Sequence, residues 1–190
     1  MACALVGASS GFAETITFED APSTYWNDNS GGQVDLGSFY PGVTFGAGAQ
    51  IEHTSSVYPA HSGVLELFAS DIGNPTIAIN FAHPQPEVSF WYTTSFGLVV
   101  TAYDSSHNQV ATLSPNGNVN LLTSVGTDSL ADLIATGGGT IASVTITDNS
   151  GLGNFFTIDD LSVPDATSTF ALLGVAGLGL LAFRRKMVTQ

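Results

Sequence analysis

Short runs in which apolar and polar residues alternate dominate the chain between residues 15 and 163. Within residues 87–93, for example, Val88, Phe90 and Tyr92 occupy every second position. Successive side chains of a β-strand point to opposite faces of a sheet, so this period of two predicts a strand with one buried face. No long segment shows the period of about 3.6 residues that an amphipathic helix requires.

Roughly ten short strands are predicted, separated by turn signals such as Pro115-Asn116-Gly117 and Asp148-Asn149-Ser150-Gly151. The predicted strands are residues 15–19, 42–45, 64–69, 76–81, 87–93, 98–103, 109–113, 119–122, 141–147 and 155–163. Only residues 129–135 are expected to form a helical turn. This pattern predicts an all-β protein with a jelly-roll or other β-sandwich architecture, followed by a short C-terminal hydrophobic helix.

Charge narrows the classes of partner. The chain has 190 residues, 16 acidic side chains and three basic ones, and the basic residues are Arg184, Arg185 and Lys186. Residues 1–183 therefore carry a formal charge of −16, against −13 for the whole chain. A body without cations cannot neutralise phosphates, so we expect no nucleic-acid binding. The one cysteine, Cys3, lies in the apolar start of the chain, so we also expect no disulfide in the mature domain.

Both ends of the chain have the composition of targeting segments. Residues 1–13 are apolar and rich in small residues, and we interpret them as the remnant of a signal peptide that is cleaved after Ala13. Residues 14–163 then form the sandwich domain, and residues 164–190 form a C-terminal sorting signal with a transmembrane segment at about 168–183. The wholly apolar part, residues 170–183, spans roughly 21 Å as a helix, which is shorter than the ~30 Å hydrocarbon core.

The tail combines a short motif, an apolar run and a basic cluster, in that order. The motif is Val163-Pro164-Asp165, and the cluster is Arg184-Arg185-Lys186. Over residues 163–186 this order resembles the PEP-CTERM sorting signals, specifically the VPDSG-CTERM variant, although Ala166-Thr167 replaces the usual Ser-Gly. The resemblance implies export, temporary retention in the inner membrane and processing by an exosortase in an exopolysaccharide-producing bacterium. The basic cluster independently favours a cytoplasmic C-terminus.

The order of the central strands resembles the galactose-binding-like jelly-roll domains that often precede such tails. The stretches that carry this resemblance are residues 16–20, 42–45, 99–104 and 156–163. A concanavalin-like sandwich would give a similar pattern. In such sandwiches the first and last strands are typically paired.

That pairing would bring the acidic residues Glu19 and Asp20 close to Asp159 and Asp160. Four carboxylates without a basic partner repel one another unless they are protonated or bridged by a cation. Carboxylate oxygens are ligands of Ca²⁺, so this cluster is a candidate structural calcium site. A regular strand would point Asp159 and Asp160 to opposite faces, so only one of them would reach the ion. The alternative is that all four are solvated acids at strand ends.

The second candidate is a sugar-binding site. Tyr25, Trp26, Asn27 and Asp28 combine aromatic faces for stacking with polar groups for hydroxyls. Further aromatic residues that would extend this surface are Tyr40, Tyr58 and Trp91. The alternative is that Trp26 packs over the end of the sandwich and that Trp91 lies inside it.

Catalytic motifs are not found. His53, His61, His83 and His107 are scattered, without the spacing of a metal site or of a catalytic triad. Glu66 and Glu87 are acids on predicted strands, without the Glu-x-Asp-x-x-Glu pattern of sandwich glycosidases. We therefore predict a non-enzymatic protein of the cell envelope or extracellular matrix. The alternative is a surface carbohydrate-binding module that recognises exopolysaccharide.

Overall fold

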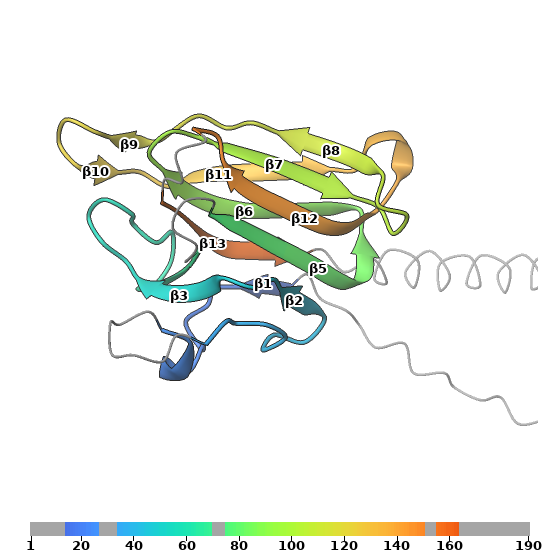
Figure 1. Ribbon diagram of the computed structural model, residues 1–190, viewed down its shortest axis with the longest axis horizontal. Coiled ribbons are helices and arrows are strands. Elements are labelled where there is room, and N and C mark those ends of the chain that lie inside the picture. The colour runs from blue at the N-terminus through green and yellow to red at the C-terminus, as the bar shows by residue number, and fades with distance from the viewer. Residues whose placement is uncertain (1–13, 27–33, 70–74, 151–154, 164–190) are drawn as a thin grey trace, which may run out of the picture.

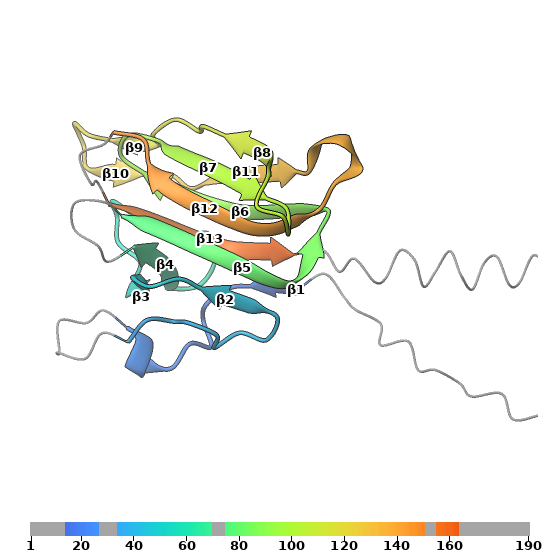
Figure 2. The same cartoon turned by 45° about the vertical axis from the view of Figure 1, so that its right-hand side comes forward.

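Two antiparallel sheets pack face to face in the computed structural model (Figures 1 and 2), which describes residues 14–26, 34–69, 75–150 and 155–163. The first sheet has the order β11-β6-β13-β4-β3, with β1 also paired to β13. Its strands are β1 (Glu14–Ile16), β3 (Ala49–His53), β4 (Leu65–Ala69), β6 (Glu87–Thr94), β11 (Ser129–Ile134) and β13 (Phe156–Val163). We call it sheet A.

Sheet B has the order β2-β5-β12-β7-β8. Its strands are β2 (Val43–Phe45), β5 (Thr76–Gln85), β7 (Leu98–Tyr103), β8 (Gln109–Leu113) and β12 (Ile141–Asp148). A small hairpin of β9 (Val119–Asn120) and β10 (Val125–Gly126) projects from one end of the sandwich (Figure 1), and two 3₁₀ turns cover Ser23–Tyr25 and Thr136–Gly138. The prediction of an all-β sandwich is confirmed.

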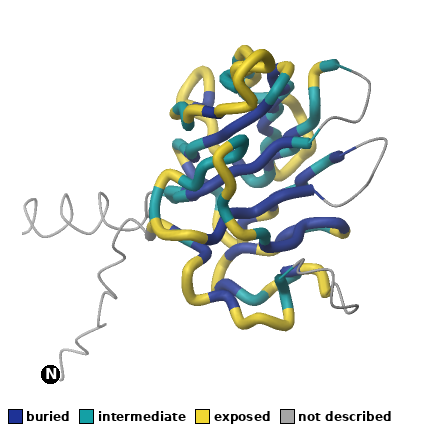
Figure 3. Tube along the Cα trace, turned by 90° about the vertical axis from the view of Figure 1, so that its left-hand side faces the viewer, coloured by how far each residue is buried: buried dark blue, intermediate teal, exposed yellow. Residues whose placement is uncertain are grey.

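The core lies between the two sheets, and the alternation of the sequence places it there. On β6, Val88, Phe90 and Tyr92 are buried against residues of sheet B such as Ile146 and Val100. Figure 3 shows buried segments in both layers, with exposed turns around them. In a simple sandwich the outer face of each sheet is exposed to solvent. Sheet A differs, because all five residues of β4 are buried, including those that face outward. Something therefore covers the outer face of β4 as well.

The predicted pairing of the first and last strands is confirmed. Strand β1 runs antiparallel to the end of β13, with Glu14 opposite Val163 and Ile16 opposite Leu161. The first and last strands of the described sandwich are therefore direct neighbours in sheet A. Strand β1 is shorter than predicted, because Phe18 has a φ of 63° and its ring turns into the core.

The helical turn predicted for residues 129–135 is wrong. This segment is strand β11, which pairs along β6 from Ser129 opposite Tyr92 to Ile134 opposite Glu87. Leu130 and Ile134 are exposed while Ala131 and Leu133 are buried, which is the alternation of a strand. Pairing with the edge of β6, which is not a local interaction, sets the extended conformation of this segment.

Two further strands were not predicted. Residues 49–53 form β3, the edge strand of sheet A, and residues 125–126 form β10. The predicted strand at 119–122 shortens to the two residues of β9. The predicted signal peptide and sorting tail, residues 1–13 and 164–190, lie outside the described residues.

Candidate functional site

A row of outward-facing side chains crosses the middle of sheet A. Glu52 of β3 lies opposite Glu66 of β4, and Asp159 of β13 lies opposite Trp91 of β6. The register between β13 and β4 pairs Ile158 with Leu67, which brings Asp159 and Glu66 into the same row. Three carboxylates on three neighbouring strands therefore stand next to a tryptophan.

These carboxylates are buried although they face away from the core. Glu66 is 1% exposed and Asp159 is 3% exposed. The pKa of Glu66 is raised to about 8, chiefly by burial; a hydrogen bond with Thr157 opposes the shift, and the neighbouring Glu52 and Asp159 add to it. Burial likewise raises the pKa of Asp159 to about 6 and raises the pKa of Glu52. Desolvation without a compensating cation favours the protonated acids.

The cover over this row is the loop of residues 54–64, which joins β3 to β4. The ring of Tyr58 in this loop packs against Phe155, with ring centroids 4.7 Å apart. Phe155 in turn stacks on Phe68 of β4, with centroids 5.3 Å apart. Several hydrogen bonds shape the loop; among them, Ser55 N–H donates to Tyr58 O, and Ala60 N–H donates to Thr54 Oγ1 at 2.8 Å. The loop explains why both faces of β4 are buried.

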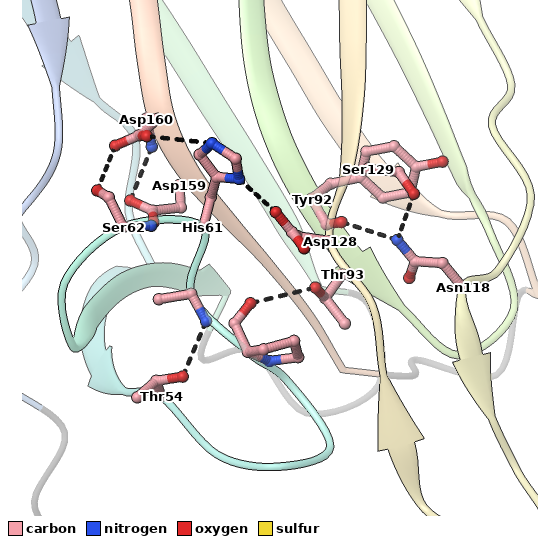
Figure 4. Close-up of polar contacts among 12 residues, drawn as sticks. Thr54, His61, Ser62, Tyr92, Thr93, Asn118, Asp128, Ser129, Asp159 and Asp160 are labelled. Atoms are coloured by element: carbon pink, nitrogen blue, oxygen red, sulfur yellow. Dashed lines mark hydrogen bonds and ion pairs between the residues drawn. The ribbon is translucent and has the colours of Figure 1, made fainter.

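His61 lies in this loop and stacks on Trp91 of β6. Its ring also links the loop to Asp160 of β13 and to Asp128, which directly precedes β11 (Figure 4). Its ring is parallel to the indole of Trp91, with an interplanar angle of 4° and centroids 3.6 Å apart. Its Nδ1 contacts Asp128 Oδ2, and its Nε2 lies 3.9 Å from Asp160 Oδ2. The His61 and Asp128 side chains are each about one third exposed, so the pair is at the surface.

A bulge in β13 turns both aspartates toward this loop. Pairing with β6 is irregular between Asp159 and Ser162, and Asp160 has a φ of 45°, which is rare for a residue with a side chain. Asp159 Oδ2 accepts the Ser62 N–H at 2.8 Å, and Asp160 Oδ1 accepts the Ser62 hydroxyl at 2.7 Å. The strand is not regular here: the bulge interrupts the alternation that would point adjacent aspartates to opposite faces.

Glu19 holds the far end of the same loop. Its Oε1 accepts the backbone N–H groups of Val64 and Leu65 at 2.8 Å and 2.6 Å. Gly63 sits directly over the carboxylate with a φ of +60°. Three of the four acids predicted to bind calcium thus converge on the loop, but through separate hydrogen bonds.

Asp20, the fourth of these acids, faces another direction. It accepts the Tyr40 hydroxyl at 2.7 Å, and burial together with Asp20 raises the pKa of that hydroxyl well above its usual range. Among the described residues, no three His, Cys, Asp or Glu side chains form a group that could hold a metal ion. Calcium binding by Glu19, Asp20, Asp159 and Asp160 stays a prediction.

Tyr25 and Trp26 of the predicted sugar site are half-buried and pack against the core. Trp26 Nε1–H donates to Ala21 O at 2.9 Å, and its ring meets His53 edge to face. Asn27 and Asp28 lie outside the described residues, so the sugar site at 25–28 stays a prediction.

The surface beside His61 has a small hollow of about 130 Å³, including the space open to solvent. It is lined mainly by residues of the carboxylate row and the His61 cluster, with Pro59, Tyr92, Thr93 and Thr157 at its margins. It has no enclosed space for even a water molecule, whereas pockets that enclose a small molecule are usually about 300–1,000 Å³. Only a ligand that lies on the surface could contact it.

Sequence reasoning missed this cluster almost entirely. The sequence pattern suggests Trp91 only as an aromatic residue that would extend the sugar site at residues 25–28. It assigns His61 and Asp128 to no site. His61 and Asp128 are 67 positions apart, so no local spacing connects them. The one available signal was the glycine at position 63, which marks a tight approach next to His61.

Comparison with protein families bears on the tail. Residues 162–187 match the VPDSG-CTERM motif. The chain carries this sorting motif. Val163 is at once the last residue of β13 and the first residue of its Val-Pro-Asp tripeptide. The other predicted sorting residues, Pro164, Asp165, Arg184, Arg185 and Lys186, lie outside the described residues, and no helix long and apolar enough to cross a membrane is found within the described ranges.

Comparison with curated proteins gives no match. Similar solved structures include a cleaved adhesin domain of Lys-gingipain, with a TM-score of 0.47 and 15% identity over 81% of this chain and 98% of that one. Another is TmCBM61 in complex with β-1,4-galactotriose, with a TM-score of 0.43 and 17% identity over 68% and 92%. A variant of the family 29 carbohydrate-binding module CBM29-2 with mannohexaose has a TM-score of 0.43 and 13% identity over 65% and 81%.

Replacing Gly63 by Ala tests the anchoring role of Glu19. A Cβ at this position would lie 2.2 Å from Glu19 Cδ, so the carboxylate must move and lose its two N–H donors. Gly42→Ala is the matched control, since Gly42 has a φ of +79° and nothing within 4 Å of its Cβ position. We expect Gly63→Ala to cost about 2 kcal/mol more than the control in urea unfolding. Equal losses would contradict the anchoring role.

The stability of the domain should fall as the pH rises toward 8. Folded Glu66 keeps its proton up to about pH 8, whereas an unfolded Glu releases it near 4.5, so stability present at low pH is lost over this range. The maximum slope is about 1.4 kcal/mol per pH unit. Urea unfolding between pH 6.5 and 8 separates this effect from that of Asp159, whose pKa is about 6.

Glu66→Gln should flatten this slope, because the amide does not titrate. Asp132→Asn, on the exposed part of β11, should leave the slope as it is in the parent. A parent protein whose stability is constant from pH 6.5 to 8 would show that Glu66 is ionised in the folded state.

Proposed function

We propose that the protein is exported, processed by an exosortase at its C-terminal motif and displayed in the cell envelope or extracellular matrix as a non-enzymatic domain. The observation that carries this proposal is the VPDSG-CTERM match at residues 162–187, which starts at the end of β13. A sorting motif of this kind implies export and a surface or extracellular location.

The tail has the physical properties that temporary retention in the inner membrane needs. Residues 170–183 contain no polar side chain, and the only cations of the chain follow them. By the positive-inside rule the basic cluster keeps the C-terminus in the cytoplasm. A span of roughly 21 Å is accommodated by local thinning of the bilayer and by arginine side chains that reach the interface.

The geometry of the acids supports a role in binding or structure rather than in catalysis. Glu66 and Asp159 are the adjacent carboxylates that most resemble an acid pair, yet both are almost fully buried beneath the loop. A glycosidic bond must lie between two catalytic carboxylates, and acids that are 1% and 3% exposed leave little surface for such a contact. Glu87, the other acid considered for such a pair, lies at the start of β6, opposite Ile134.

Mass spectrometry of the intact mature protein from its host tests processing. We expect a C-terminus between residues 163 and 169, and we expect Asp165→Ala to reduce the processed fraction because it alters the recognition tripeptide. A strain that lacks the exosortase is the control and should retain Gln190. A mature protein from the parent strain that still ends in Gln190 would contradict the proposal.

A second candidate function is carbohydrate binding at the surface. It is favoured by one observation: Trp91 and Asp128 line the shallow hollow together, and His61, which stacks on the indole, lies 3.9 Å from the carboxylate of Asp160. Sugar sites combine an aromatic face with acceptors for hydroxyl groups. The absence of Lys and Arg from residues 1–183 favours a neutral polysaccharide over an anionic one.

Affinity electrophoresis in gels that contain neutral polysaccharides tests this second function. Trp91→Ala should remove the retardation of the parent, since the stacking face is lost. Trp26→Ala, run in parallel, tests the alternative site at residues 25–28. If both variants migrate like the parent in every gel that retards it, neither tryptophan carries the binding.

A further inference from the structure

His61 occupies the face of Trp91 that a ligand ring would need. The two rings are parallel and 3.6 Å apart, which is van der Waals contact distance. We propose that His61 is a removable plug on a sugar-binding platform, and that the ligand is a sugar ring that donates hydrogen bonds and carries no negative charge. The proposal rests on the carbohydrate-binding function given above and specifies its site.

The imidazole already makes the contacts expected of such a ring. Its flat face covers the indole, and its two nitrogens approach carboxylates from different strands and loops, Asp128 through Nδ1 and Asp160 through Nε2. Ionised carboxylates only accept hydrogen bonds. When the imidazole leaves, hydroxyl or amino groups at the edge of a stacked sugar can take its place at both acids.

Electrostatics selects against anionic sugars at this position. Asp128 and Asp160 flank the platform, Asp159 lines the hollow, and no Lys or Arg precedes Arg184. A uronate or sulfated sugar would bring a further negative charge to a site without a compensating cation. Neutral and amino sugars share the required chemistry, and the experiment below separates them.

The side chain of His61, rather than the loop, is the part that can move. Backbone N–H groups on both sides of it are fixed, Ala60 to Thr54 Oγ1 and Ser62 to Asp159 Oδ2, each at 2.8 Å. Glu19 fixes the end of the loop at Leu65. The His61 side chain is 33% exposed, so rotation about its χ angles brings it into solvent without unfolding the loop.

Removing the plug should therefore increase affinity. A ligand binds only the fraction of molecules in which the platform is free, so its apparent affinity is reduced by that fraction. Ring stacking and a surface ion pair are each modest interactions. We expect His61→Ala to bind about tenfold more tightly than the parent.

Isothermal titration calorimetry on the full chain in detergent tests this. The probes are cellohexaose, mannohexaose and a chitosan hexamer, with a guluronate hexamer as the anionic control. The variants are His61→Ala, His61→Ala combined with Trp91→Ala, and His107→Asn. His107 stacks on Tyr103 in the β7–β8 turn with an interplanar angle of 5°, so its replacement is the matched loss of a second histidine–aromatic stack. Asn is chosen because it tolerates the φ of 62° there.

Acrylamide quenching of Trp91 fluorescence reports on the plug without any ligand. All proteins for this measurement carry Trp26→Phe, which leaves Trp91 as the single tryptophan. His61→Ala should quench more strongly than the parent, while His107→Asn should not.

The outcomes separate the plug from the platform. Tighter binding of at least one uncharged or amino sugar by His61→Ala, lost again with Trp91→Ala and absent for guluronate, supports the proposal. Equal or weaker binding by His61→Ala overturns the plug and leaves the carbohydrate-binding function in place. Increased quenching without binding of any probe by any variant overturns sugar recognition at Trp91, and with it the proposal.

Discussion

Carboxylates that accept backbone hydrogen bonds hold the loops of this sandwich in place. Glu19 receives the N–H groups of Val64 and Leu65, and Asp159 receives that of Ser62. Asp104 does the same for the β7–β8 turn, where the hydrogen bonds from Asn108 and Ser106 hold its pKa below the usual value. Hydrogen bonds to charged groups are stronger than those between neutral groups, and here they take the place of Lys and Arg salt bridges, because residues 1–183 contain neither residue.

The same solution creates the chemistry of the outer face of sheet A. Because the anchored loop covers β4, Glu66 and Asp159 are buried without a Lys or Arg beside them, and protonation of Glu66 reduces the repulsion between the two acids. Gln50 Oε1 and Glu52 Oε2 on the adjacent strand are buried without a hydrogen-bond partner in the described part of the chain. These buried polar groups lie beneath the same loop that carries His61. The stability of the domain and the accessibility of its candidate binding surface therefore depend on one loop.

Much of the fold could be predicted from local pattern. The alternation at Val88, Phe90 and Tyr92 predicted β6 and its core face, and similar patterns predicted most other strands because burial of one face leaves a period of two in the sequence. Residues 49–53 alternate as well, and were missed because they are short and polar. Residues 129–134 were misassigned because the decisive interaction, pairing with β6, is not local.

The sequence by itself determined the sorting motif: the Val-Pro-Asp tripeptide, the apolar run and the final basic cluster follow one another along the chain, so their order can be recognised without any fold. It also determined the sandwich and the lack of internal cations. Only the tertiary structure decided which acids meet, because a bulge at Asp160 turned two aspartates toward one loop. Only the tertiary structure placed His61 on Trp91, since that contact depends on strand register and on a loop anchored by Glu19 from a distant part of the chain.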